Sequence, residues 1–424
     1  MKNSFILLFT FLSLSAYTQN KLEYLKNNRI DLSSSEFNFP DKEFNIIGFG
    51  GYHGSSKIED VEIELLTSLS KNKSIKYYLP ETDYSIAHFF NQYLKTGDTI
   101  LLKDLVTVYG IRVPQERTIE VYEKWKKLKK LNDKLPKKEK LNVVGIDIQV
   151  NYKYVSKYIL EVVKESKSEP KAIQAIQAIR EMVTIDTTSY NLGDLSYAYK
   201  VLKSFVTDYE NNRSLYEKNI IKKSNFKHII KNLNISFDFS NQYRDRDNVM
   251  YENYLSLDAI HNFKTQPQFL RMGFSHIEKS REGQDGYPYF FTRLIENKIY
   301  DKNKVISIIG YYTDSKVVWD ELYDDQGNYK GYTVEAGFGI GDYQKEYFRG
   351  IQNLKDAKLS DRTLFKLNKT NSPYLLNEPD LIEVIMEDEK SNGDAVKGMS
   401  PLDFLDYAIL ISNSKESTPI FEMK

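Results

Sequence analysis

The sequence predicts an α/β fold, in which a mostly parallel sheet is flanked by helices and interrupted by a helical insertion. Short apolar runs ending in glycine or acidic residues alternate with stretches whose apolar residues recur every three or four positions. This is the pattern of buried strands followed by helices. Residues 150–262 keep the helical pattern and have no convincing strand. Strands alternating with helices favour parallel pairing.

The first half of the sheet is expected from three apolar runs and the helices between them. In chain order we expect a strand around residues 46–47, a helix over 58–69, a strand over 76–79, helices over 86–94 and 114–131, and a strand over 141–146. Ser56 and Glu59 have the spacing of a capping box at the first helix. We interpret the lysine-rich run over 124–140 as a solvated helix face.

The second half of the sheet follows the insertion. We expect strands over residues 268–273, 305–309 and 407–411, and a β-like region over 317–341 with a hairpin turn at 325–328. The chain then divides into a signal peptide (1–18), the first part of the α/β domain (19–149), the helical insertion (150–262), and the second part of that domain with a β-rich C-terminal region (263–424).

The N-terminus has the pattern of a signal peptide. Lys2 provides a short basic region, residues 5–14 are apolar, and Ala16-Tyr17-Thr18 offers a cleavage site. The apolar run is too short to span a bilayer as an ordinary helix, and a buried N-terminal helix is the alternative. We therefore expect an exported protein, either periplasmic or extracellular, whose mature chain is not inserted in a membrane.

Composition narrows the expected partners. Lys+Arg and Asp+Glu both number 59, so the formal net charge is zero and nothing draws the chain globally to nucleic acid. There is no cysteine, which excludes disulfides and thiolate chemistry. We expect a small-molecule substrate and no nucleic-acid partner.

Four chemically capable residues each follow a different predicted strand. They are His53, Glu81, Asp147 and His276. Ligands of open α/β sheets bind beyond the carboxyl ends of the strands, so a shared position at that edge makes these residues a candidate site. Each also has a local alternative, because the histidines could serve turns and the carboxylates could cap helices.

Two chemistries suit those residue types. A histidine can take a proton from water near neutral pH when a carboxylate fixes its tautomer, and a second histidine can polarise the substrate. We expect no cofactor for this chemistry. The alternative is a divalent metal, zinc or manganese, bound by His53, Glu81 and His276. The glycines around His53 are not followed by Gly-Lys-Ser/Thr, so a phosphate-binding loop is the weaker interpretation.

Short blocks along the chain resemble the erythromycin esterase-like family, within the wider group that includes ChaN and the Tiki metalloproteases. The blocks are Gly50-Gly51-Tyr52-His53-Gly54, Tyr78-Leu79-Pro80-Glu81, Val144-Gly145-Ile146-Asp147-Ile148-Gln149, Arg244-Asp245-Arg246 with Met250, Glu252 and Asn253, Met272-Gly273-Phe274-Ser275-His276, and Phe404-Leu405-Asp406-Tyr407-Ala408-Ile409. They occur in the family's order over most of residues 44–420.

The resemblance implies hydrolysis of an ester or lactone. His53 would be the general base, Glu81 would support the site, His276 would bind or polarise the substrate, and Asp147 and Arg244 would be substrate-binding residues. Where the family has glutamate, arginine and histidine, this chain has Gly50, Glu62 and Gly273. A Tiki-like metal-dependent hydrolase and an inactive exported binding protein that keeps the fold are the alternatives.

Overall fold

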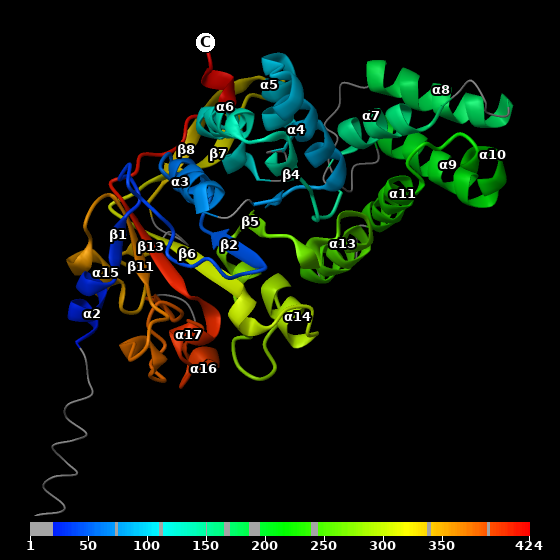
Figure 1. Ribbon diagram of the computed structural model, residues 1–424. Coiled ribbons are helices and arrows are strands. Elements are labelled where there is room, and N and C mark those ends of the chain that lie inside the picture. The colour runs from blue at the N-terminus through cyan, green and yellow to red at the C-terminus, as the bar shows by residue number, and fades with distance from the viewer. Residues whose placement is uncertain are drawn as a thin grey trace, which may run out of the picture.

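The computed structural model describes residues 20–424 except 73–74, 110–112, 150, 165–169, 186–195, 239–244, 337–340 and 388–390. The predicted signal peptide, residues 1–18, and Arg244 lie outside the described residues. In the described part, eight strands form the main sheet (Figure 1). Their spatial order is β1 (Arg29–Asp31), β11 (Arg362–Lys366), β13 (Tyr407–Ser412), β6 (Val305–Thr313), β2 (Ile46–Gly50), β5 (Gln268–Met272), β3 (Tyr77–Pro80) and β4 (Asn142–Val143).

The sheet is mostly parallel, as the sequence predicted. The strands from β13 across to β4 pair in parallel, whereas β1 and β11 add an antiparallel edge. A hairpin is formed by β7 (Val317–Tyr323) and β8 (Tyr329–Glu335), and a smaller sheet by β9 (Asp342–Tyr343), β10 (Glu346–Phe348) and β12 (Val384–Met386). These elements account for the β-like region expected after residue 317.

Helices cover both faces of the sheet, so its central strands are apolar on both sides. One face carries α3 (Ile58–Asn72), α4 (Tyr84–Thr96), α5 (Thr99–Tyr109) and α6 (Ile119–Lys134). The other carries α2 (Lys21–Asn27), α13 (Arg246–His261), α14 (Phe290–Glu296), α15 (Ile351–Ala357), α16 (Gly393–Val396) and α17 (Pro401–Phe404). Along β2 the faces alternate, with Ile46 in one core cluster and Ile47 in the other.

The described part of residues 150–262 is helical. It contains α7 (Tyr152–Val162), α8 (Pro170–Ile185), α9 (Tyr197–Asn211), α10 (Arg213–Glu217), α11 (Lys223–Phe237) and α13. Helices α7 to α11 project from the β4 end of the sheet, on the opposite side from β1 (Figure 1). Among the described helices, none combines the length and the apolar character needed to cross a membrane.

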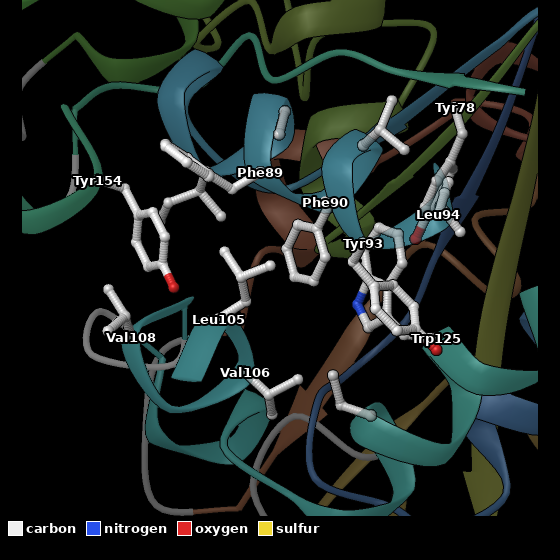
Figure 2. Close-up of a cluster of buried hydrophobic side chains, with 14 of the residues drawn as sticks. Tyr78, Phe89, Phe90, Tyr93, Leu94, Leu105, Val106, Val108, Trp125 and Tyr154 are labelled. Carbon is white, nitrogen blue, oxygen red and sulfur yellow. The ribbon is translucent and has the colours of Figure 1, made fainter. Parts of the chain in front are cut away.

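An aromatic cluster anchors α4 and α6 to the sheet (Figure 2). The rings of Phe90 and Trp125 stack with centroids 3.7 Å apart, and Tyr78 of β3 packs against the same indole. Leu105 of α5 and Tyr154 of α7 belong to the same buried cluster. This packing fixes α6 relative to β3, and therefore fixes the side chains that α6 directs toward the sheet.

Two local expectations were wrong. The strand expected over residues 141–146 ends at Val143, because Gly145 passes so close to Asp83 that a Cβ atom would lie 2.1 Å from its carbonyl oxygen. The expected capping box does not form, since Glu59 is buried with its Oε2 2.8 Å from Lys124 Nζ. At the start of α3, the N–H of Lys57 instead donates a hydrogen bond to Ser414 Oγ at 3.1 Å.

Candidate active site

The four residues expected at the strand ends lie at one edge of the sheet. His53 follows β2, Glu81 follows β3, Asp147 follows β4, and His276 lies in the 3₁₀ turn η5 (Phe274–Ile277) after β5. Three of them are joined through one guanidinium, that of Arg246. The fourth, His53, contacts Glu81, with 3.3 Å between Nε2 and Oε2. The sequence prediction of a single convergent cluster therefore agrees with the geometry.

His53 lies between two carboxylates. Its Nδ1 contacts Oε1 of Glu116, and its Nε2 faces Glu81. Only 15% of the His53 side chain is exposed. Burial on its own lowers the pKa of His53, but the charges and hydrogen bonds of Glu116 and Glu81 outweigh it and raise that pKa to about 9. At neutral pH the His53 ring is thus an imidazolium in the resting site.

Glu116 was not expected from the sequence. It ends the 3₁₀ turn η1 (Pro114–Glu116), which the sequence prediction had treated as the first turn of α6. Burial raises the pKa of Glu116, but the facing charges of His53, Lys124 and Arg271 lower it to about 2. Glu116 follows no strand, so the strand-end rule could not find it.

A C-terminal segment holds the two turns that carry His53 and Glu116. Ser417 N donates to the carbonyl of Gly54 at 2.7 Å, beside His53. Ile420 N donates to Arg117 O at 2.7 Å, one residue after Glu116. Residues 414–420 therefore fix the distance between His53 and its carboxylate partner.

Arg246 is the central cation of the site. Its Nη2 donates to Glu81 Oε1 at 2.7 Å and to Asp147 Oδ2 at 2.6 Å, and its Nε donates to Asp147 Oδ1 at 2.9 Å. Burial lowers the pKa of Arg246, but Asp147 and Glu81 more than offset this and raise it. The sequence prediction named Arg244 as a substrate-binding residue, and Arg244 lies outside the described residues. The described helix α13 begins at Arg246, which faces the site.

His276 has a different environment from His53. Its Nδ1 lies 2.7 Å from Asp247 Oδ1, and its Nε2 lies 3.0 Å from Arg246 Nη1. A guanidinium can only donate hydrogen bonds, so Nε2 of His276 accepts and Nδ1 donates to Asp247. Asp247 also accepts from Phe290 N at 2.9 Å. Asp247 is a second site residue that the sequence prediction missed.

The geometry shows whether Glu81 caps a helix or belongs to the site. Asp83, not Glu81, caps α4, because its Oδ1 accepts from Ser85 N at 2.8 Å and from Ile86 N at 3.1 Å. Both oxygens of Glu81 are directed to the site, where Oε2 also accepts from Gly273 N at 2.9 Å. Glu81 therefore belongs to the site cluster.

The three departures from the family pattern have different surroundings. A Cβ at Gly50 would lie 2.6 Å from the Cα of Phe274, so η5 fills the space that a larger residue needs. Glu62 is fully buried, accepts from the Tyr78 hydroxyl, and has its Oε2 3.1 Å from Lys124 Nζ. Nearby cations thus balance the reversed charge at this position. A Cβ at Gly273 would meet only His276, at an ordinary 3.6 Å.

The residues do not fit the metal alternative. Arg246 already donates to Glu81 and to Nε2 of His276, and a divalent cation on those atoms would face its positive charge. Within the described residues, no three histidine, aspartate or glutamate side chains converge as ligands for a metal ion.

No protein-family model matches the sequence, and no curated protein matches it. Solved structures do match the fold. A protein of Bacillus cereus has a TM-score of 0.62 at 16% identity, over 94% of this chain and 98% of its own. A succinoglycan biosynthesis protein has a TM-score of 0.59 at 15% identity, over the same shares of 94% and 98%.

An erythromycin esterase, EreC, solved as a variant in its open conformation, has a TM-score of 0.56 at 11% identity, over 89% of this chain and 92% of its own. These matches place the chain in one class of fold, that of α/β proteins with a mostly parallel sheet flanked by helices. Within that class, the chain has the erythromycin esterase-like fold, which confirms the resemblance predicted from the sequence blocks.

Proposed function

We propose that this protein is an exported hydrolase that cleaves an ester or lactone of a small molecule without a metal ion. The observation that supports this best is the pairing of His53 with Glu116, beside Glu81, in a fold shared with an erythromycin esterase. A carboxylate on one ring nitrogen and a reactive position at the other is the arrangement used for proton transfer in acyl hydrolysis.

In the proposed reaction, neutral His53 accepts a proton from water at Nε2. The water oxygen attacks the acyl carbon, and the resulting imidazolium then gives the proton to the alkoxide oxygen as the ester bond breaks. Glu116 stabilises the positive charge that forms on the ring. Because the resting pKa of His53 is about 9, we expect kcat/KM to rise with pH up to that value.

Arg246 and His276 would bind the substrate on the other side of the site. Substrate entry would compete with the contacts that Arg246 now makes, since its donors already engage carboxylates. Asp147 would keep the guanidinium oriented through two hydrogen bonds. We assign Asp147 an indirect part in binding, through Arg246.

The test is hydrolysis of a panel of activated esters and lactones by the mature chain, with and without EDTA. We expect turnover that EDTA does not change and that His53→Ala reduces by roughly 10²–10⁴-fold. His88→Ala is the matched control, because His88 contacts Glu161 at the surface. Turnover that survives His53→Ala removes His53 as the base.

A second candidate function is a binding protein that keeps the fold without turnover. The observation that favours it is the resting imidazolium, since His53 held between Glu116 and Glu81 is not free to act as a base at neutral pH. No hydrolysis of any ester at pH 9 to 10, together with specific small-molecule binding, would support this candidate.

Export is part of the proposal. Cleavage after Thr18 would release a mature chain that begins at Gln19. Mass spectrometry of the protein recovered outside the cytoplasm should give that N-terminus. Recovery of the whole chain from the cytoplasm alone would contradict the proposal.

A further inference from the structure

Two buried asparagines join α11 of the helical insertion to the strand end that carries Asp147. Asn232 lies on α11 and Asn253 on α13, and neither residue is more than 3% exposed. Nδ2 of Asn232 donates to Oδ1 of Asn253 at 3.1 Å, and Nδ2 of Asn253 donates to Oδ1 of Asn232 at 2.9 Å. We call these two residues the asparagine pair. Figure 1 shows α11 beside α13.

The orientation of both carboxamides follows from their neighbours. Nδ2 of Asn253 also lies 3.0 Å from Ile146 O and 3.3 Å from Asp147 O. Nδ2 of Asn232 lies 3.0 Å from His228 O. A carbonyl oxygen only accepts hydrogen bonds, so an amide nitrogen must face each of these oxygens. Each carboxamide oxygen therefore faces the amide nitrogen of its partner, and neither side chain can be flipped without losing its bonds.

Asn253 holds both peptide units that flank the Cα of Asp147. The unit before that Cα contains the carbonyl of Ile146 and the N–H of Asp147, which donates to Thr82 O at 3.1 Å. The unit after it contains the carbonyl of Asp147 and the N–H of Ile148, which donates to Asp147 Oδ1 at 2.7 Å. Because each peptide unit is planar, a bond that fixes its carbonyl also fixes its N–H. One side chain therefore sets the backbone around Asp147 and the direction of the N–H that holds its carboxylate.

That carboxylate is the one that orients Arg246. Oδ1 of Asp147 accepts from Arg246 Nε at 2.9 Å as well as from Ile148 N, and Oδ2 accepts from Arg246 Nη2 at 2.6 Å. Arg246 and Asn253 lie about two turns apart on α13, and so on the same face of that helix. This face therefore holds Asp147 twice, by its carboxylate and by its backbone.

The packing of α11 on α13 does not by itself require the asparagine pair. Replacing both partners of a buried hydrogen bond by apolar groups of the same shape can be nearly neutral for stability. A second polar contact, 3.0 Å between His228 Nδ1 and Ser256 Oγ, also joins the two helices. An apolar pair could not, however, donate to the carbonyls of Ile146 and Asp147. The property that the carboxamides add to packing is therefore the donor directed at Asp147.

We propose that Asn253 is a positioning residue for Arg246, and that Asn232 keeps the Asn253 side chain in the orientation this needs. Asn253 acts through Asp147, and α11 of the insertion contributes through Asn232. The inference rests on the proposed function for its purpose, because the binding of substrate by Arg246 belongs to that proposal. Its physical content, the fixed geometry of the Arg246–Asp147 pair, does not depend on any substrate.

The experiment measures hydrogen exchange of the Arg246 Nε–H group by NMR in the mature chain, with the signal assigned by its loss in Arg246→Lys. This proton is bonded to Asp147 Oδ1, so its exchange reports how often the pair opens. Asn253→Ala should speed the exchange by about tenfold, the equivalent of about one hydrogen bond, and should shift the signal. Asn232→Ala should speed it by a smaller factor, because Asn253 then keeps its donor and loses only its partner.

Asn91→Ala is the matched control. Nδ2 of Asn91, on α4, donates to Val143 O at 2.7 Å, and its Oδ1 accepts from Val143 N at 2.8 Å. This variant also removes side-chain hydrogen bonds to the backbone of β4, upstream of Asp147, and should also lower stability. It leaves both peptide units that flank Asp147 bonded to Asn253, so the exchange of Arg246 Nε–H should keep its wild-type rate.

A double variant keeps the test decisive if Asn253→Ala does not fold. Asn232→Leu with Asn253→Leu replaces both carboxamides by apolar side chains of similar size, which limits the loss of stability. It still removes the donor to the carbonyls of Ile146 and Asp147. The exchange of Arg246 Nε–H should therefore be as fast as expected for Asn253→Ala.

A wild-type exchange rate at Arg246 in folded Asn253→Ala, or in the double leucine variant, overturns the inference. Equal acceleration in Asn91→Ala also overturns it, because a general loosening would then be the common cause. A wild-type rate in Asn232→Ala overturns the part assigned to α11. Failure of the proposed function has a different signature: no ester is hydrolysed, while the effect of Asn253→Ala on exchange persists.

Discussion

The two histidines of the site have the same kind of partner at Nδ1 but partners of opposite charge at Nε2. His53 and His276 each contact a carboxylate through Nδ1, from Glu116 and Asp247. At Nε2, however, His53 meets the carboxylate of Glu81 and His276 meets the guanidinium of Arg246. The first ring therefore faces a carboxylate at both nitrogens, whereas the second accepts a hydrogen bond from a cation at Nε2.

This difference divides the site into a proton-transfer side and a binding side. A ring between two carboxylates can release and regain a proton without changing its partners. The His276 ring, which accepts from Arg246, serves to orient that arginine, which in turn joins Glu81 to Asp147. Four variants can break this division.

Arg246→Met should have the largest effect on stability. It leaves the carboxylates of Glu81 and Asp147 without their shared cation, and removing one partner of a buried ionic group costs about 3–5 kcal/mol. Urea unfolding at pH 7 measures the change in the free energy of unfolding. Arg281→Met is the control, since its partner Glu296 is exposed, and it should cost about 1 kcal/mol or less. Equal losses in both variants would contradict a central role for Arg246.

His276→Leu should be the next most damaging. It leaves Asp247 with the Phe290 N–H as its remaining described donor and frees one Arg246 N–H, which costs about 1–3 kcal/mol. The same urea experiment measures this loss. The proton-transfer side should be unaffected, so the NMR midpoint of His53 should stay near 9. A shift in that midpoint would show that the two sides are not separate.

Glu116→Gln should change the pH dependence of stability. The pKa of His53 is about 9 in the folded protein, above the ~6.5 of an unfolded chain. The contribution of His53 to the free energy of unfolding is complete below pH ~6.5 and is lost as the pH rises through about 9. The slope is at most about 1.4 kcal/mol per pH unit. Glutamine removes the negative charge, so this slope should become shallower. Unfolding free energies between pH 6 and 10 test it, and an unchanged slope would remove Glu116 as the cause.

His88→Ala should have the smallest effect. His88 also contacts a carboxylate, with 2.8 Å between Nε2 and Glu161 Oε2, but that carboxylate is 43% exposed. Exposed ion pairs contribute about 0–1 kcal/mol. Thermal unfolding should therefore shift little and any hydrolysis should be unchanged. A large loss would mean that contact with a carboxylate, rather than burial between charges, sets the behaviour of His53.

The parallel strands of the sheet could be predicted from local pattern, and so could the side chains at their ends, whereas the antiparallel edge strands β1 and β11 were not expected. His53, Glu81 and His276 were found because a parallel sheet brings all its carboxyl ends to one edge. Glu116 could not be found this way, since η1 reaches the site through the packing of α6 and the C-terminal segment. Its place depends on contacts between residues far apart in the sequence.

Two other residues show what local pattern can and cannot tell. Arg246 was not singled out as a site residue, because the direction of its side chain depends on where α13 begins, and helix boundaries are the least predictable feature of a sequence. Lys124, in contrast, left a signal: it falls between Val121 and Leu128 on the buried stripe of α6. A lysine at such a position indicates a buried counter-charge, although the lysine-rich run as a whole predicts a solvated face.

The C-terminal segment that joins the two turns has a consequence for how the protein is made. The contact of Lys57 with Ser414 spans 357 residues of sequence, so the His53 turn leaves the ribosome long before the segment that secures it. Pairings of such separation form slowly, because a long loop must close first. We therefore expect the His53–Glu116 pair to be among the last features to form, after synthesis of the chain rather than during it, so that a nascent chain carries the residues of the site without its geometry.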